Sequence, residues 1–237
     1  MHPPKSTSPE AGNLWEPIAW AELEAGLVPA RLSPYLEHAS GDRDFAISLY
    51  LWNILLCESL YPLLNLGEIT LRNRFHQILS QHFQREDWFD DVWLDPRDAS
   101  KIKDAKKKVA DRRLEVTPVR VVSGLTFGFW TSLLDVRYER SHILWPVLAP
   151  KIFADAPSRL RTRKEQSRHA AQLRRLRNRV FHHEPIWKLD DLPDVVNQSE
   201  IWLSWLNPEI AKLHNLIGRF GSVYSEGPSV VPAIKLI

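Results

Sequence analysis

The 237-residue chain is predicted to fold as an all-α helical bundle. Apolar residues recur at spacings of three and four in segment after segment, which is the helical period, whereas the alternation typical of strands is almost absent. Glycine is scarce, at 9 residues, and tryptophan is plentiful, at 10. Because barrels and phosphate-cradling nucleotide folds need glycine at their turns and loops, this composition argues against both. No GxGxxG or Walker-type loop occurs in the sequence.

The first third of the chain is predicted to hold a tail and two or three helices. Residues 1–13 are polar and proline-rich and are expected to be disordered, and Arg31–His38 forms a short helix. An apolar face then runs from Asp42 to Pro62, where the proline either kinks one continuous helix or begins a new one. The second stretch of this pattern covers Leu63–His82.

The middle of the chain is predicted to alternate loops and buried helices. Trp88–Pro96 is an acidic, aromatic loop, and Ser100–Leu114 is a lysine-rich helix. Val119–Leu134 is expected to be the most buried helix, because it carries no charge from Val121 to Leu134, and Ser141–Phe153 to be a shorter one.

The last third begins with an arginine-rich helix. Asp155 is the expected N-cap, Arg159–Phe181 is rich in helix formers, and Pro185 stops the helix by disfavouring helical geometry in the residue before it. Two further helices are predicted over Leu189–Trp205 and Glu209–Phe220.

The chain is predicted to form one all-α domain over residues 14–224, followed by a proline-punctuated apolar tail over 225–237. No internal repeat and no long linker interrupts it. Two strongly apolar stretches, Ile47–Leu66 and Val121–Leu134, are expected to be core helices. The first contains polar residues and a proline, and the second is shorter than the ~20 residues a membrane helix needs.

The expected compartment is the cytoplasm, with no membrane association. Cys57 is the single cysteine and cannot form an internal disulfide, and the polar first residues do not have the pattern of a signal peptide.

The formal net charge of +2 hides an asymmetry. Residues 157–188 contain ten Lys and Arg against two Glu, a local charge of +8 that leaves −6 for the remainder of the chain. A polyanion would be attracted to this one helix, and the planar fork of arginine suits phosphate. The alternative is a solvated basic face without a partner. The residues predicted to contact RNA are Arg168, Arg174, Arg175 and Arg179.

The end of this basic helix concentrates groups that could cleave RNA without a metal. Histidine can accept the proton of a ribose 2′-hydroxyl or donate one to the leaving 5′-oxygen, and arginine can stabilise charge on the phosphate. Arg177, Asn178 and His182 are the candidate catalytic residues, with Asn178 four residues before His182 and able to orient its ring. The alternative is a helix end without chemistry. A metal site is not predicted, because the adjacent His182 and His183 diverge by ~100° and no HExxH spacing supports them.

Helical geometry separates the two main candidates. At 100° per residue Arg177 and His182 lie ~140° apart around the axis. If Leu173, Leu176 and Val180 form the buried stripe, Arg177 lies at its edge and His182 points away from it. Two copies of the helix meeting antiparallel would bring an arginine and a histidine from each chain into one cleft, as an isologous dimer permits.

Five segments in a fixed order resemble a known family. They are Leu32-Ser33-x-Tyr35-Leu36, Leu49-Tyr50-x-Trp52-Asn53, Glu68-x-x-Leu71-Arg72-Asn73, Val122-Ser123-x-Leu125-x-Phe127-Gly128-Phe129-Trp130 and Leu176 to Ile186. From about Leu32 to Ile186 the chain resembles the Abi-like proteins of bacterial abortive-infection systems, a branch of the HEPN superfamily.

The resemblance implies an all-α HEPN fold, a homodimer that pairs two Arg-x(4–6)-His motifs, and metal-independent endoribonuclease activity that leaves a 2′,3′-cyclic phosphate and uses no cofactor. Arg177 matches the motif arginine, Asn178 the polar residue after it, and His182 the motif histidine. His183 fits the same window, so the second imidazole stays open between the two.

A second Arg-Asn pair, Arg72-Asn73, follows Glu68 by one helical turn, a spacing suited to an ion pair between Glu68 and Arg72. These three residues are candidate auxiliary groups. They either form a structural bridge beneath the catalytic helix or help to bind phosphate, and His76 lies one turn further on.

The expected function is a cytoplasmic, homodimeric endoribonuclease that acts as a phage-defence effector or toxin. RNA is the expected substrate. The sequence leaves open whether a guide, a structured regulatory RNA or an antitoxin restrains the activity. The alternative is a non-catalytic RNA-binding defence protein that uses helix 157–181. A third reading is a partner-binding module that docks through the apolar tail Val230–Ile237.

Overall fold

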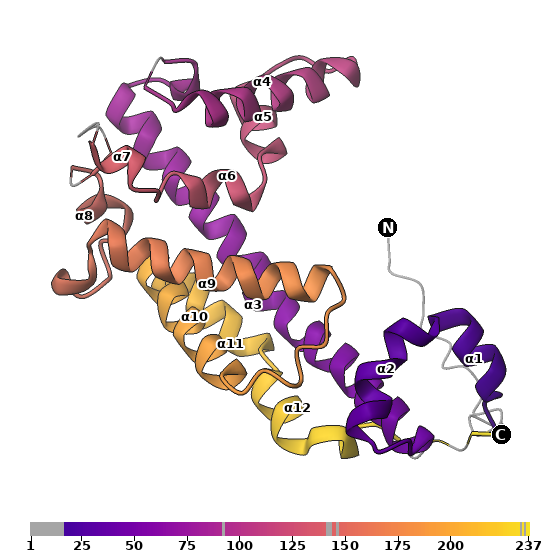
Figure 1. The fold of residues 1–237 in the computed structure, drawn as a ribbon. Coiled ribbons are helices and arrows are strands. Elements are labelled where there is room, and N and C mark those ends of the chain that lie inside the picture. The colour runs from indigo at the N-terminus through magenta and orange to yellow at the C-terminus, as the bar shows by residue number, and fades with distance from the viewer. Residues whose placement is uncertain (1–16, 92, 141–143, 146, 233, 235) are drawn as a thin grey trace, which may run out of the picture. The chain divides into compact units, whose positions relative to one another are not determined.

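The computed structural model describes residues 17–91, 93–140, 144–145, 147–232, 234 and 236–237. Within these residues the chain forms twelve α-helices and no strand, so the predicted all-α class is confirmed (Figure 1). The tail predicted over residues 1–13 lies outside the described residues. The chain divides into two compact units, residues 1–56 with 222–237, and residues 57–221. The single domain predicted over 14–224 stays a prediction.

The first unit contains helices α1 (Trp20–Leu27) and α2 (Pro29–His38), the start of α3 (Arg43–Phe83) and most of α12 (Phe220–Glu226). The predicted helix Arg31–His38 is confirmed within α2. Trp20, Leu32 and Ile47 form its small core, against which Leu236 packs. The backbone N–H of Trp20 donates to the carbonyl of Ile237 at 2.9 Å, so the end of the chain is tied to this unit.

Helix α3 is continuous through Pro62, which resolves the two alternatives that the sequence left open. Proline removes one backbone hydrogen bond, and the long apolar face compensates for it. In the second unit this face includes Leu63, Leu71 and Phe75, all almost fully buried. Within the described chain, α3 is the one helix with the length and composition of a membrane span, and half of its most apolar window is buried in the protein.

The stretch after α3 contains a short 3-10 helix, Trp88–Asp90, and the lysine-rich helix α4 (Pro96–Asp111). The prediction of one helix over Val119–Leu134 is wrong, because the chain forms α5 (Pro118–Gly124) and α6 (Phe127–Ser132) with Leu125 and Thr126 extended between them. Glycine is a weak helix former that favours helix ends, and threonine suits the N-cap position, so this sequence favours a break.

The predicted helix Ser141–Phe153 is also wrong, since its described residues are helical only at α8 (Ala149–Ile152), and α7 (Arg137–Arg140) lies before it. Pro150 is suited to the first turn of a helix and sets the start of α8.

Helix α9 runs over Arg163–Phe181, after a short 3-10 helix over Ser158–Leu160. The prediction of Asp155 as its N-cap is wrong, because the Thr162 hydroxyl accepts the bond from the backbone N–H of Glu165 at 3.3 Å. Thr162 and Glu165 have the spacing of a capping box.

Helix α9 ends before Pro185, as predicted. Helices α10 (Leu192–Leu206) and α11 (Pro208–Ile217) follow. The helix predicted over Glu209–Phe220 therefore ends early, and α12 begins at Phe220 after a non-helical Gly218.

Candidate active site at the end of helix α9

Helix α9 is fixed to the second unit through one apolar stripe. Leu173, Leu176 and Val180 are 1%, 3% and 9% exposed, which confirms the predicted stripe. Helix α3 approaches this stripe closely at Gly67, where a Cβ atom would lie 2.7 Å from the Cδ2 atom of Leu173. This close approach places the residue after Gly67, Glu68, beside the edge of α9.

Arg177 lies at that edge and meets two groups. Its Nε atom is 3.7 Å from the Oε2 atom of Glu68, and its Cζ atom is 4.5 Å from the centre of the Phe181 ring. The Nε atom is buried and has no hydrogen-bond partner among the described residues. The guanidinium is therefore held by Coulomb attraction and by a cation–π contact, without short hydrogen bonds at Nε.

Glu68 thus connects two groups of residues that the sequence singled out separately. Its partner is Arg177 rather than the Arg72 suggested by helical spacing. Arg72 instead donates from Nε to the Oδ1 atom of Asn73 at 3.1 Å. The structure joins Glu68 to the end of α9 and leaves Arg72 and Asn73 bonded to each other on α3.

His76, one turn beyond Arg72, serves packing. Its Nδ1 atom accepts a hydrogen bond from the indole N–H of Trp88 at 3.0 Å. Burial lowers the pKa of His76 below its usual value, and the Arg72 charge adds to that effect although the Glu86 charge opposes it. A neutral ring with Nδ1 as acceptor is what this bond requires.

The C-terminus of α9 closes with a Schellman motif. The backbone N–H of His183 donates to the carbonyl of Val180 at 3.1 Å, and that of Glu184 to the carbonyl of Arg179 at 2.9 Å. His183 takes the left-handed φ of +57° that this motif requires and that glycine usually occupies. The two histidines therefore differ in backbone conformation. His182 has a negative φ of −94°, whereas His183 is left-handed.

His182 is exposed, and its backbone N–H donates to the carbonyl of Asn178 at 2.8 Å. Asn178 is also exposed. Because α9 is continuous to Phe181, Arg177 and His182 stay ~140° apart around its axis. One chain alone does not direct both groups at the same point.

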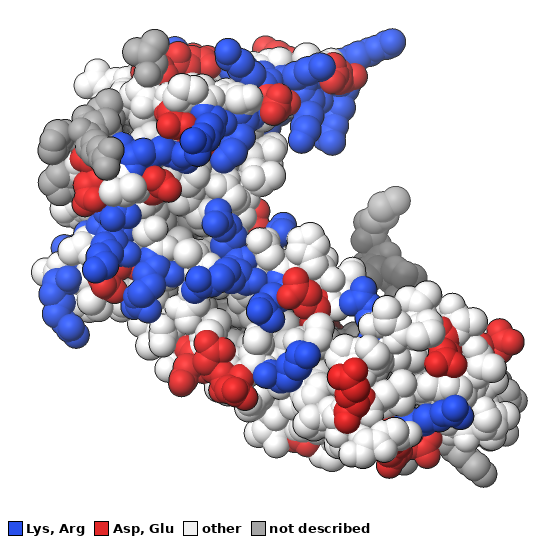
Figure 2. All heavy atoms as spheres, in the orientation of Figure 1, with Lys and Arg blue, Asp and Glu red and all other residues white. Residues whose placement is uncertain are grey.

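Lys and Arg side chains gather over α4 and α9 (Figure 2). The arginines of residues 157–188 differ in what they contact. Arg168 bonds the Glu165 carboxylate at 3.2 Å, and Arg174 donates to the Thr131 hydroxyl at 3.1 Å. Arg179 lies 3.7 Å from Glu184. Arg175 is exposed and makes no ion pair within the described part of the chain. Of the four residues predicted to contact RNA, Arg175 has the least engaged guanidinium.

Two cavities adjoin α9. The larger, of about 450 Å³, lies at its start beside Glu139, Arg161 and Arg163 and contains none of the predicted site residues. Arg163 is occupied there, since its Nε atom donates to Glu139 at 2.8 Å. The smaller, of about 220 Å³, is lined by Arg175 and Arg179.

Sequence reasoning missed two features of this region. Phe181 is 45% exposed although it is apolar, and it carries the Arg177 guanidinium on its ring. The spacing of four residues between Arg177 and Phe181 was the available signal. The smaller cavity has no sequence signal, because it is formed by α9, the loop that follows it and the start of α10.

In the part of the chain that the structure describes, no group of three or more His, Cys, Asp or Glu side chains could hold a metal ion. Comparison with protein-family models, with curated proteins and with solved structures finds no match to this chain.

Proposed function

We propose that this protein is a metal-independent endoribonuclease of the HEPN type, acting as a phage-defence effector or toxin. The observation that carries the proposal is that one helix end holds both a half-buried arginine, fixed by Glu68 and Phe181, and an exposed histidine at its C-cap. The resemblance of five ordered segments to the Abi-like family supports it.

The proposed reaction is attack of a ribose 2′-oxygen on the adjacent phosphorus. His182 accepts the 2′-hydroxyl proton as the bond from the 2′-oxygen to phosphorus forms. It returns a proton to the 5′-oxygen as the bond from phosphorus to that oxygen breaks. Arg177 stabilises the charge on the phosphate oxygens, and Asn178 orients the imidazole. The products are a 2′,3′-cyclic phosphate and a 5′-hydroxyl.

The proposed site is composite. Since Arg177 and His182 leave α9 in directions ~140° apart, the arginine of one copy would act with the histidine of another. Glu68 and Phe181 hold the Arg177 guanidinium at the edge of α9, and the exposed part of that side chain is the part a second copy and its RNA could reach.

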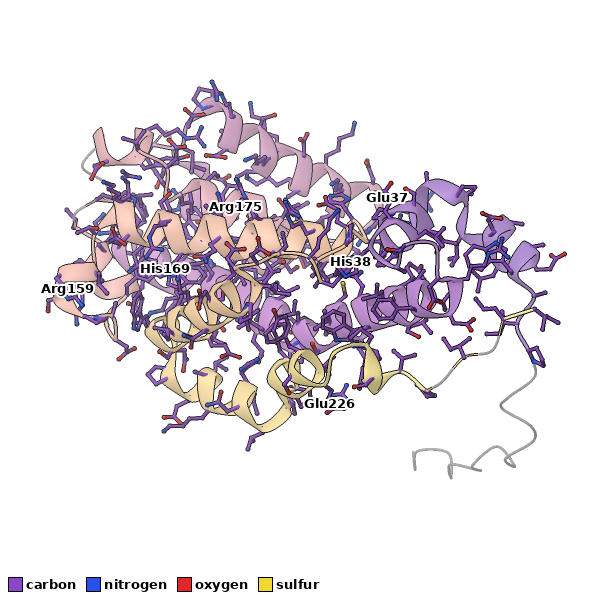
Figure 3. The ribbon with its side chains drawn as sticks, turned by 60° about the horizontal axis from the view of Figure 1, so that its bottom comes forward. Glu37, His38, Arg159, His169, Arg175 and Glu226 are labelled. Atoms are coloured by element: carbon purple, nitrogen blue, oxygen red, sulfur yellow. The ribbon has the colours of Figure 1, made fainter. Side chains whose placement is uncertain are left out.

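The test is the double variant Arg177→Ala with His182→Ala, purified and incubated with RNA in EDTA. We expect cleavage and growth inhibition on overexpression to be lost while the helical content is kept. Arg159→Ala is the matched control, because Arg159 is an exposed arginine at the other end of the segment (Figure 3). Cleavage by the double variant at the wild-type rate, or product ends without a cyclic phosphate, would contradict the assignment.

The second candidate is an RNA-binding protein without catalysis. The exposed Lys164 and Arg175 favour it, because they are cations that a polyanion could reach. Binding that weakens with salt and leaves the RNA intact would select this function.

A further inference from the structure

The smaller cavity beside α9 has the chemistry of a nucleotide site. It holds about 220 Å³ and lies between α9 and the segment that leads into α10. Arg175, Leu176 and Arg179 line it from α9, and Leu189, Asp191 and Val195 from the other side. Cations, an apolar surface and one carboxylate therefore meet in one concave place, as in small-molecule sites generally.

The two arginines present a phosphate-binding edge. Arg175 and Arg179 are four residues apart and share one face of α9. Arg175 has no ion-pair partner in the described part of the chain, and Arg179 faces Glu184 at 3.7 Å with both side chains almost half exposed. An exposed pair of this kind contributes little, so a phosphate that offers charge-assisted bonds can replace it.

The rest of the lining suits a base and its polar edge. Leu176 is buried, and Leu189 and Val195 are half-buried, which provides an apolar surface for a flat ring. Asp191 is exposed just before α10 and can accept a hydrogen bond from a base amino group or a ribose hydroxyl. Phosphate, apolar ring and hydrogen-bond donor together describe a nucleotide.

The cavity lies on the same side of α9 as the candidate imidazole. Arg175, Arg179 and His182 fall within about 60° of one another around the helix axis, whereas Arg177 lies about 160° from both arginines. A nucleotide in the cavity would therefore neighbour His182 of its own chain, while the arginine of the composite site would come from the partner.

We propose that this cavity binds one nucleotide of the RNA, adjacent to the linkage on which His182 acts. The proposal rests on the proposed function, since it names a substrate contact of that site. It assigns phosphate binding to Arg175 and Arg179, ring contact to Leu189 and Val195, and a polar contact to Asp191.

The test measures binding without cleavage. The full chain carrying Arg177→Ala and His182→Ala is titrated with AMP by calorimetry, with inorganic phosphate as competitor. We expect saturable binding that Arg175→Ala weakens by about tenfold, as the loss of one charged hydrogen-bond donor does. Leu189→Trp fills the cavity without changing any charge, so it should abolish AMP binding. Arg159→Ala should leave AMP binding unchanged.

Absence of saturable AMP binding, or equal binding by the parent protein and by Arg175→Ala, overturns the proposal. Binding that Arg159→Ala weakens as much as Arg175→Ala does overturns it too, because it would indicate only a general basic surface. The AMP titration does not depend on cleavage. If the wild type binds AMP in this cavity but does not cleave RNA, the proposed function fails and the nucleotide site stands.

Discussion

Two clusters in the second unit each join an arginine to a carboxylate, and they differ in how many hydrogen bonds the carboxylate accepts. The first surrounds Asp98 of α4, which is fully buried. Its carboxylate accepts from the Tyr138 hydroxyl at 2.6 Å, from Ser132 and Lys101 at 2.8 Å, and from Arg137 at 2.9 Å. Burial alone would raise the pKa of Asp98, but the bonds from Lys101, Tyr138 and Ser132 lower it, so the carboxylate stays ionised.

The second cluster joins Arg177 to Glu68 at 3.7 Å, with the two side chains 33% and 29% exposed. Arg137 and Arg177 each have one buried Nε atom without a hydrogen-bond partner among the described residues, so the difference between the two clusters lies at the carboxylate. Loss of the Asp98 carboxylate from this saturated cluster should therefore destabilise the fold strongly, whereas the loose, half-exposed cluster of Glu68 and Arg177 should contribute little to stability.

Removing the centre of the saturated cluster should have the largest effect. Asp98→Ala removes the carboxylate that accepts from the Arg137 guanidinium and from the buried Tyr138 hydroxyl. We expect the free energy of unfolding in urea to fall by about 3–5 kcal/mol, as it does when one partner of a buried ion pair is removed. A loss below about 1 kcal/mol would show that this cluster is no more stabilising than a surface pair.

The approach of α3 to α9 positions the loose cluster, and Gly67 permits that approach. Gly67→Val should force a branched side chain against Leu173, which a Cβ atom alone would already meet at 2.7 Å. We expect a loss of about 1–3 kcal/mol in the free energy of unfolding, the usual range for overpacking. An unchanged thermal midpoint would contradict the close contact between the two helices.

His169 within α9 and His182 at its C-cap differ in the same way, since His169 is buried and His182 is exposed. Burial lowers the pKa of His169 to about 4, and the charge of Arg168 adds to this. Between this pKa and the ordinary histidine pKa of 6.5, the unfolded chain binds a proton at His169 that the folded chain does not bind. The free energy of unfolding should therefore be greatest above pH 6.5 and should fall as the pH drops towards 4.

This loss should be on the order of 1–3 kcal/mol. Urea unfolding of the wild type and of His169→Gln at pH 7 and pH 5 measures it. The variant should show a smaller difference between the two pH values. If the wild type and His169→Gln lose the same free energy of unfolding between pH 7 and pH 5, a group other than His169 causes the loss.

Glu68→Gln should have the smallest effect on stability, below about 1 kcal/mol, because its ion pair is partly exposed. We expect a clear fall in the rate of RNA cleavage at saturating RNA, since the loss of the charge releases the Arg177 guanidinium. Glu58→Gln is the control. Glu58 lies on α3, as Glu68 does, and forms an exposed ion pair with Arg219. Equal rates for the two variants would remove the positioning role of Glu68.

The sequence was sufficient for the features that depend on local pattern. The stripe of Leu173, Leu176 and Val180, the end of α9 before Pro185 and the all-α class all follow from periodicity and from proline. The break at Leu125 could not be read from periodicity, because two short helices with a common buried side keep the same spacing of apolar residues.

The remaining errors and omissions depend on competition between local signals and on contacts between distant residues. Asp155 and Thr162 are both good caps, and the capping box with Glu165 decided between them. Glu68 could pair with Arg72 on its own helix or with a residue on another, and only the packing at Gly67 decides for Arg177. The roles of Arg177, Asn178, His182 and His183 in RNA cleavage stay predictions.

The composite site is tested most directly by mixing two inactive proteins. Arg177→Ala and His182→Ala are denatured together, refolded together and assayed for RNA cleavage. In a mixed dimer one site contains the intact arginine of one copy and the intact histidine of the other, so the mixture should recover about a quarter of the wild-type activity. A mixture as inactive as either variant alone would contradict the account.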